Sequence, residues 1–120
     1  MDIKLTHADN RLLAIVWESE PILSPDLCKL AETHLGWKRT TTYTVLKRLC
    51  DKKLLNNKNA LVTSLISKEA VQKNESRKVV QRVFDGSLPL FIAAFLDGGK
   101  ISETEAEKIK QLIDAFREKR

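Results

Sequence analysis

The segment from Trp37 to Leu49 constrains the fold of this chain more than any other stretch of its sequence. At helical spacing, one side of this segment holds Thr42, Val45, Leu46 and Leu49. The other sides carry short hydroxyls, a tyrosine and cations, and no carboxylate occurs before Asp51. A solvent-facing helix usually interleaves acids with bases. We therefore predict a helix that packs on one side and meets an anionic partner on the other.

Two further helices are predicted before this segment. The first starts at Thr6, whose hydroxyl can cap it while Asp9 supports its first turn, and it ends before Pro21. The second is predicted from the sequence Ser24-Pro25-Asp26, with a cap, a proline at the first helical position and an acid, and it runs to Gly36. The basic helix, at residues 39–52, follows after very few residues. Two helices joined so closely predict a helix-turn-helix.

Beyond it, residues 54–66 predict two short strands around an Asn-rich turn, which in this position is a wing. Three more helices are predicted at about 68–84, at 88–96 and after Ser102, where Glu105 suits a capping box. The predicted fold is therefore mainly α with a small β-hairpin wing. It comprises a winged helix-turn-helix domain at 1–67 and a three-helix dimerisation segment at 68–120.

The positive charge of the chain is local. The chain has a net charge of +5, and residues 37–58 carry seven lysines and arginines against one acid, Asp51. Such a patch is typical of phosphate binding, although a solvated basic helix is the plainer interpretation. We expect the cations mainly on phosphates, the hydroxyls and the tyrosine on base edges or adjacent phosphates, and the Thr41 and Thr44 methyls near thymine. The predicted DNA-binding residues are Lys38, Arg39, Thr40, Thr41, Tyr43, Thr44, Lys47, Arg48 and Lys58.

The helix predicted at 88–96 is apolar on almost every side. Three helices in roughly fifty residues can bury little against one another, and a helix that is apolar all round needs cover from another chain. The sequence therefore predicts a homodimer. The predicted dimerisation residues are Val80, Val83, Phe84, Leu88, Phe91, Ile92, Phe95, Leu96, Ile109, Leu112, Ile113 and Phe116.

Other classes of protein find little support in the sequence. The only cysteines and histidines, Cys28, Cys50, His7 and His34, have no recurring zinc spacing, so no metal site and no cofactor are expected. Trp17 and Trp37 are expected in the core and not as platforms for bases. No catalytic nucleophile, acid pair or phosphate loop is evident, which argues against an enzyme. Without a signal peptide, membrane span or disulfide framework, a cytoplasmic protein is expected.

The whole chain resembles the BlaI/MecI/CopY family of bacterial transcriptional repressors, the penicillinase repressor family. The resemblance lies in the order and spacing of several short motifs: Trp17, Trp37, Thr41-Thr42-Tyr43-Thr44 with Leu46-Lys47-Arg48-Leu49, Leu65-Ile66-Ser67, Glu75-Ser76-Arg77, Phe84-Asp85-Gly86-Ser87, Ala93-Ala94-Phe95-Leu96 and Ser102. It implies a winged helix that binds DNA and a helical tail that dimerises on a two-fold symmetric operator. For the β-lactam branch it also implies inactivation by proteolysis at an Asn-Phe bond, which a membrane-bound sensor protease would control.

The chain departs from the family pattern at several positions. The pair that matches the cleaved bond is Ala94-Phe95, which keeps only the phenylalanine. The copper branch carries paired cysteines near its C-terminus, whereas this chain has no cysteine after Cys50, so the β-lactam branch is the closer one. Lys38 stands where the family usually places a capping serine, and the wing is short, with Lys58 as its cation.

The leading hypothesis is therefore a homodimeric repressor that occupies a symmetric operator through the helix at 39–52. Cutting the helix at 88–96 would separate dimerisation from DNA binding. The alternative hypothesis is a helical adaptor that binds proteins through a winged-helix scaffold without sequence-specific DNA binding. Affinity for duplex DNA that falls with salt distinguishes the first from the second.

Overall fold

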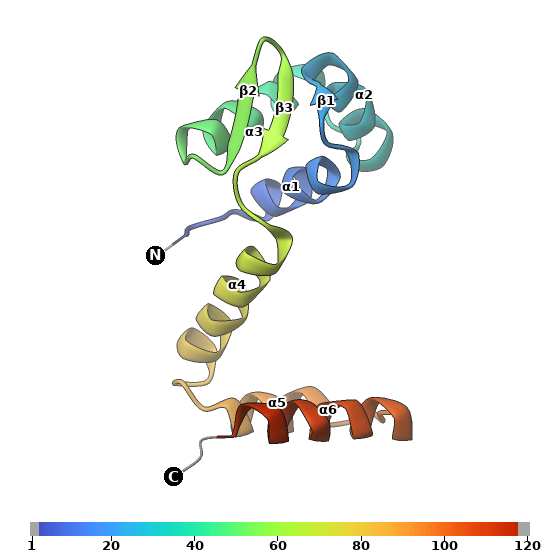
Figure 1. Ribbon diagram of the computed structural model, residues 1–120, viewed down its shortest axis with the longest axis vertical. Coiled ribbons are helices and arrows are strands. Elements are labelled where there is room, and N and C mark those ends of the chain that lie inside the picture. Colours follow the sequence, from blue (N-terminus) through green and yellow to red (C-terminus); the bar gives the residue numbers. More distant parts are fainter. Residues whose placement is uncertain (1–2, 118–120) are drawn as a thin grey trace. The chain divides into compact units, whose positions relative to one another are not determined.

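The computed structural model describes residues 3–117, which fold into helices and a small sheet (Figure 1). The elements in chain order are α1 (His7–Ser19), β1 (Ile22–Leu23), α2 (Ser24–Leu35), α3 (Arg39–Asp51), β2 (Leu55–Lys58), β3 (Leu61–Ser64), α4 (Lys68–Val83), α5 (Leu88–Leu96) and α6 (Glu103–Phe116). The described residues form two compact units that divide between Arg77 and Lys78, within α4.

The first unit is a winged helix-turn-helix, as the sequence predicts. In Figure 1, α1, α2 and α3 lie against a sheet whose strand order is β1-β3-β2. The hairpin of β2 and β3 is antiparallel, with Leu55 opposite Ser64 and Lys58 opposite Leu61. Its turn residues Asn59 and Ala60 both have positive φ, the conformation that suits a two-residue hairpin loop.

Strand β1 is not predicted by the sequence pattern. It is two residues long and pairs antiparallel with β3, so that Ile22 lies opposite Val62. The wing is therefore the larger part of a three-stranded sheet and not an isolated hairpin. Glu20, just before β1, strengthens this junction because its carboxylate accepts hydrogen bonds from the amide and the hydroxyl of Ser64, at 2.8 and 2.7 Å.

The core of the first unit joins all three helices to the sheet. Trp17 and Trp37 pack against it, as predicted, and the indole nitrogen of Trp17 donates to the carbonyl of Ile66 at 3.0 Å. The buried apolar side chains are Leu12, Leu13, Val16, Leu27, Ala31, Val45, Leu46, Leu49, Leu54, Leu55 and Val62. Because α3 contributes three of these residues, core packing holds one side of the helix against the rest of the unit.

Most helix ends follow the predicted capping residues. Thr6 and Asp9 form a reciprocal capping box at the start of α1, and Gly36 ends α2 with a φ of 69°. The hydroxyls of Ser67, Ser87 and Ser102 accept amide hydrogen bonds in the first turns of α4, α5 and α6.

The N-cap of α2 differs from the prediction, whereas that of α3 agrees with it. Helix α2 begins one residue early, so that Leu23 is its N-cap and Ser24 lies buried inside the helix. At α3, Lys38 occupies the N-cap, and in the described part of the chain its side chain makes no capping hydrogen bond.

The second unit leaves its apolar residues exposed. Within residues 88–116, all of which the structure describes, neither α5 nor α6 has a buried residue. Phe91 has the rings of Phe84 and Phe95 beside it, at centroid distances of 5.4 and 6.2 Å. Over residues 3–117, no single helix is long and apolar enough to cross a membrane, and only the bent pair α4 and α5 meets that criterion when taken together.

Candidate nucleic-acid interface

Helix α3 divides its faces between packing and solvent. Thr42, Val45, Leu46 and Leu49 are buried, which confirms the side that the sequence predicts to pack. Tyr43 is half-buried beside the core. Six further residues that are predicted to contact DNA, between the N-cap of α3 and Lys47, are exposed: Lys38, Arg39, Thr40, Thr41, Thr44 and Lys47. The structure therefore brings three cations and three hydroxyls together on the outer surface of α3.

The threonine hydroxyls on α3 are partly used within the helix. Thr44 Oγ1 donates to the carbonyl of Thr40 at 2.9 Å, and Thr42 Oγ1 donates to that of Lys38 at 3.3 Å. A hydroxyl that gives its proton to the preceding turn can still accept a hydrogen bond. Exposed Thr44 therefore offers an outside partner a methyl group and lone pairs.

Arg39 and Tyr43 form a pair at the start of the helix. The guanidinium carbon of Arg39 lies 5.6 Å from the centre of the Tyr43 ring, a distance at which cation and ring attract each other. This contact holds the arginine against the helix and leaves its N–H groups available for other acceptors.

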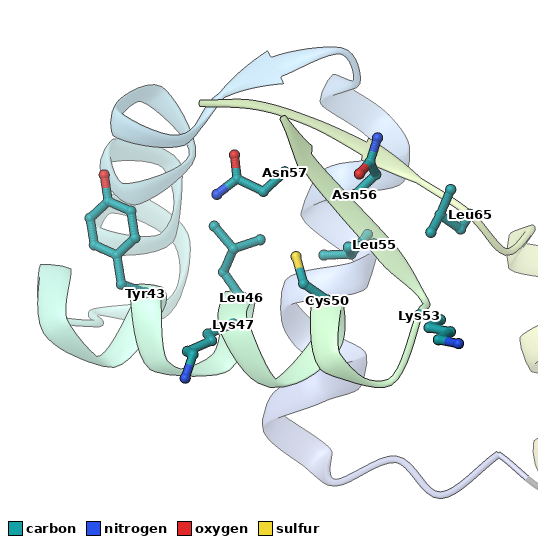
Figure 2. Close-up of a pocket in the computed structure, with 9 residues that line it drawn as sticks. All are labelled: Tyr43, Leu46, Lys47, Cys50, Lys53, Leu55, Asn56, Asn57 and Leu65. Carbon is teal, nitrogen blue, oxygen red and sulfur yellow. The ribbon is translucent and has the colours of Figure 1, made fainter. Parts of the chain in front are cut away.

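A groove of about 620 Å³ lies between α3 and β2 (Figure 2). Figure 2 shows Leu46, Cys50 and Leu55 along its floor, while Lys47 points away from the strand. Tyr43, Asn56 and Asn57 supply polar atoms at its edge. Cys50 is partly buried, and burial together with the neighbouring Asp51 raises the pKa of its thiol.

The strongest electrostatic feature joins the end of α3 to the start of α1. The Asp9 carboxylate is fully buried, and its Oδ1 accepts from Arg48 Nε at 2.9 Å and from Arg48 Nη2 at 2.7 Å. Its Oδ2 accepts from Lys52 Nζ at 2.9 Å and from the Thr6 amide at 3.0 Å. We call these four residues the Asp9 cluster.

Burial alone would raise the pKa of the Asp9 carboxyl, but the hydrogen bonds from Lys52, the Thr6 amide and Arg48 outweigh it and lower the pKa. The carboxylate is therefore ionised at neutral pH. The sequence pattern predicts a phosphate contact for Arg48 and only a role in the first turn of α1 for Asp9. The i, i+4 spacing of Arg48 and Lys52 was a usable signal, because it places two cations on one side of α3.

The sequence of the chain is similar to those of known bacterial repressors. Residues 5–115 match the model of the penicillinase repressor family. The chain belongs to this family. It is 20% identical to the penicillinase repressor of Bacillus licheniformis over 121 residues, which cover 98% of this chain and 94% of that protein. The alignment with a crystal structure of the adhesin competence repressor from Streptococcus pyogenes covers 97% of this chain and 80% of the repressor chain, with a TM-score of 0.44 and 17% sequence identity.

As a family member, the chain is a winged-helix transcriptional repressor, which is a class of protein without catalytic activity of its own.

The remaining predicted contact, Lys58, is exposed at the end of β2, beside the turn of the wing.

The residues predicted to dimerise lie on α4, α5 and α6, except Phe84, which directly follows α4. Val80, Phe84 and Phe91 are half-buried, and the other nine are exposed. Ala94 and Phe95, the predicted cleavage position, lie inside α5, where Phe95 is 72% exposed.

Proposed function

We propose that this repressor binds duplex DNA as a homodimer, with α3 of each copy in the major groove of one half-site. The observation that carries the proposal is the division of α3: one side is buried in the core, and the opposite side gathers cations and hydroxyls, with no carboxylate before Asp51 at the end of the helix. An exposed surface of this composition suits the acceptor oxygens of the phosphate backbone and the edges of bases.

The proposed contacts divide between phosphates and bases. Lys38, Arg39 and Lys47 are assigned mainly to phosphates, with Lys58 of the wing on the flanking backbone. Thr40, Thr41, Tyr43 and Thr44 are assigned to base edges or adjacent phosphates. The Thr44 hydroxyl donates its proton to the Thr40 carbonyl, so its oxygen can accept a hydrogen bond from a base amino group in the groove. The Thr44 methyl group can contact a thymine methyl. Arg48 is left out of this set because its guanidinium donates to Asp9 within the chain.

A second copy of the chain is the proposed cover for α5 and α6. Among the described residues, eleven of the fourteen exposed large apolar side chains lie between Val83 and Phe116. Apolar surface on this scale is costly in water, and a self-complementary face that meets its own copy removes it in pairs. Such a dimer presents two α3 helices to two half-sites at once, which raises affinity well beyond that of one copy.

Control by proteolysis is proposed at Ala94-Phe95, which corresponds in position to the cleaved bond of the β-lactam branch. The chain carries no cysteine after Cys50, so the paired cysteines of the copper branch have no counterpart. A cut within α5 would remove α6 and part of the apolar surface from the DNA-binding unit. A sensor protease encoded beside the gene would support this route, and its absence would count against it.

The proposal is tested by fluorescence anisotropy with labelled duplexes from the region upstream of the gene and with random duplexes, over a series of salt concentrations. We expect preference for the upstream DNA and a logarithm of affinity that falls linearly with the logarithm of salt concentration. Lys47→Ala should reduce the salt slope by about one.

Lys110→Ala is the matched control, because Lys110 is an exposed lysine on α6, outside the proposed DNA interface. It should leave the salt slope unchanged. A protein without preference and without salt dependence would be an adaptor and not a DNA-binding repressor.

A further inference from the structure

We infer that Asp9 is a positioning residue for the DNA-binding helix and that Arg48 serves it through the Asp9 cluster and not through phosphate contact. This inference rests on the proposed function of α3. It assigns to α1, which carries none of the proposed DNA contacts, control over how the exposed side of α3 is aimed.

The geometry of the cluster constrains α3 at its C-terminal end. Arg48 and Lys52 lie one helical turn apart, and both reach the same carboxylate 39 and 43 residues away in the chain. Arg48 Nη2 also lies 3.3 Å from Thr6 Oγ1, and Lys52 Nζ donates to the Lys4 carbonyl at 2.8 Å. The last turn of α3 is thus tied to the first turn of α1 and to the segment just before it.

These bonds supply direction that the core contacts lack. Thr42, Val45, Leu46 and Leu49 hold α3 against the core mainly through apolar contact, and apolar attraction is not directional. A fixed carboxylate that receives Nε and Nη2 of one guanidinium accepts few rotations of the helix about its axis. Tyr43, Thr44 and Lys47 lie within about one and a half turns of Arg48, so a rotation there displaces them directly.

The burial of Asp9 supports a positioning role for the Asp9 cluster and argues against a surface ion pair without structural effect. Asp9 is completely inaccessible to solvent, while the side chains of Arg48 and Lys52 are 39% and 32% exposed. A carboxylate buried in this way depends on its partners, since an unpaired charge in a protein interior is strongly unfavourable. The helix ends add to the pairing, because Asp9 lies in the first turn of α1 and Arg48 in the last turn of α3.

Arg48→Lys separates positioning from phosphate contact. Lysine keeps the positive charge and has a high helix propensity. Its single ammonium group cannot reproduce the two hydrogen bonds that Nε and Nη2 of Arg48 donate to Asp9. We expect the affinity for upstream DNA to fall about tenfold or more, with the affinity for random DNA and its salt slope within about twofold of the wild type. Arg11→Lys, an exposed arginine on α1 outside the cluster, is the matched control and should change neither affinity.

Asp9→Asn provides a second, independent measurement. It removes the carboxylate charge and releases Arg48 and Lys52, so the salt slope for random DNA should become steeper by up to about two while specific affinity falls. Asp26→Asn makes the same change in charge at an exposed position on α2, outside the proposed contacts, and should leave specific affinity unchanged. Circular dichroism shows whether each variant folds. If Asp9→Asn unfolds, the Arg48→Lys result alone decides.

The possible results are distinct. Equal losses of specific and random affinity in Arg48→Lys would mean that the guanidinium itself binds phosphate, and no loss in either would mean that the cluster does not aim the helix. Both results overturn the inference. If the wild-type protein itself shows no preference for upstream DNA, the proposed function fails, and the positioning role fails with it.

Discussion

The exposed apolar surface of α5 and α6 leads to a quantitative prediction for Phe95→Ala. Burial of a phenylalanine side chain stabilises an interface by about 1.5–3 kcal/mol. Because Phe95 is 72% exposed in the single chain, about 1–2 kcal/mol of this remains for each copy to gain on dimerisation. A symmetric dimer contains the residue twice, so the substitution should weaken dimerisation by about 2–4 kcal/mol, or about 30- to 1,000-fold in dissociation constant.

Sedimentation equilibrium over a range of protein concentrations measures this change directly. Alanine favours a helix, so α5 itself should remain formed, and circular dichroism can verify this. Leu23→Ala is the matched control, because Leu23 is an exposed apolar residue on β1 in the other unit. Dimerisation of Phe95→Ala as tight as that of the wild type would refute the assignment of this surface to a second copy.

Three further predictions concern the first unit. Thr6→Ala should lower the free energy of unfolding by about 1 kcal/mol in urea titrations, because the Thr6 hydroxyl accepts the Asp9 amide in the capping box of α1. Asp9 has a lowered pKa in the folded chain, so its stabilisation is complete above its unfolded pKa of about 3.9 and is lost as pH falls through the folded value. Urea midpoints from pH 6 to 2 should therefore fall more steeply for the wild type than for Asp9→Asn. Thr44→Val keeps a methyl group and removes the hydroxyl, so a selection from randomised duplexes should show a changed preference at one base pair with random-DNA affinity unchanged.

Features of the fold that depend on local chemistry could be predicted from the sequence. The spacing of Val45, Leu46 and Leu49 identified the buried side of α3, and Gly36 identified the end of α2. The Asn-rich stretch identified the turn of the wing, where Asn59 and Ala60 have positive φ. Each of these signals is contained within one turn of helix or one tight loop, so no distant part of the chain is needed to interpret it.

Features that depend on distant partners could not be predicted in this way. Ile22 and Leu23 form a strand only because β3, about forty residues later, lies beside them. The Arg48 side chain meets Asp9 across 39 residues, and its sequence neighbours make it look like one more cation of a DNA-binding helix. Pairing between distant segments is set by tertiary packing, which the pattern of a short segment does not contain.

Hydroxyl-radical footprinting of the wild-type protein on the upstream DNA that it binds best can show whether two copies of α3 occupy two half-sites. We expect two protected patches related by two-fold symmetry, with centres about one helical turn or a whole number of turns apart. A single unsymmetrical patch, or protection without preference for any position, would contradict this expectation.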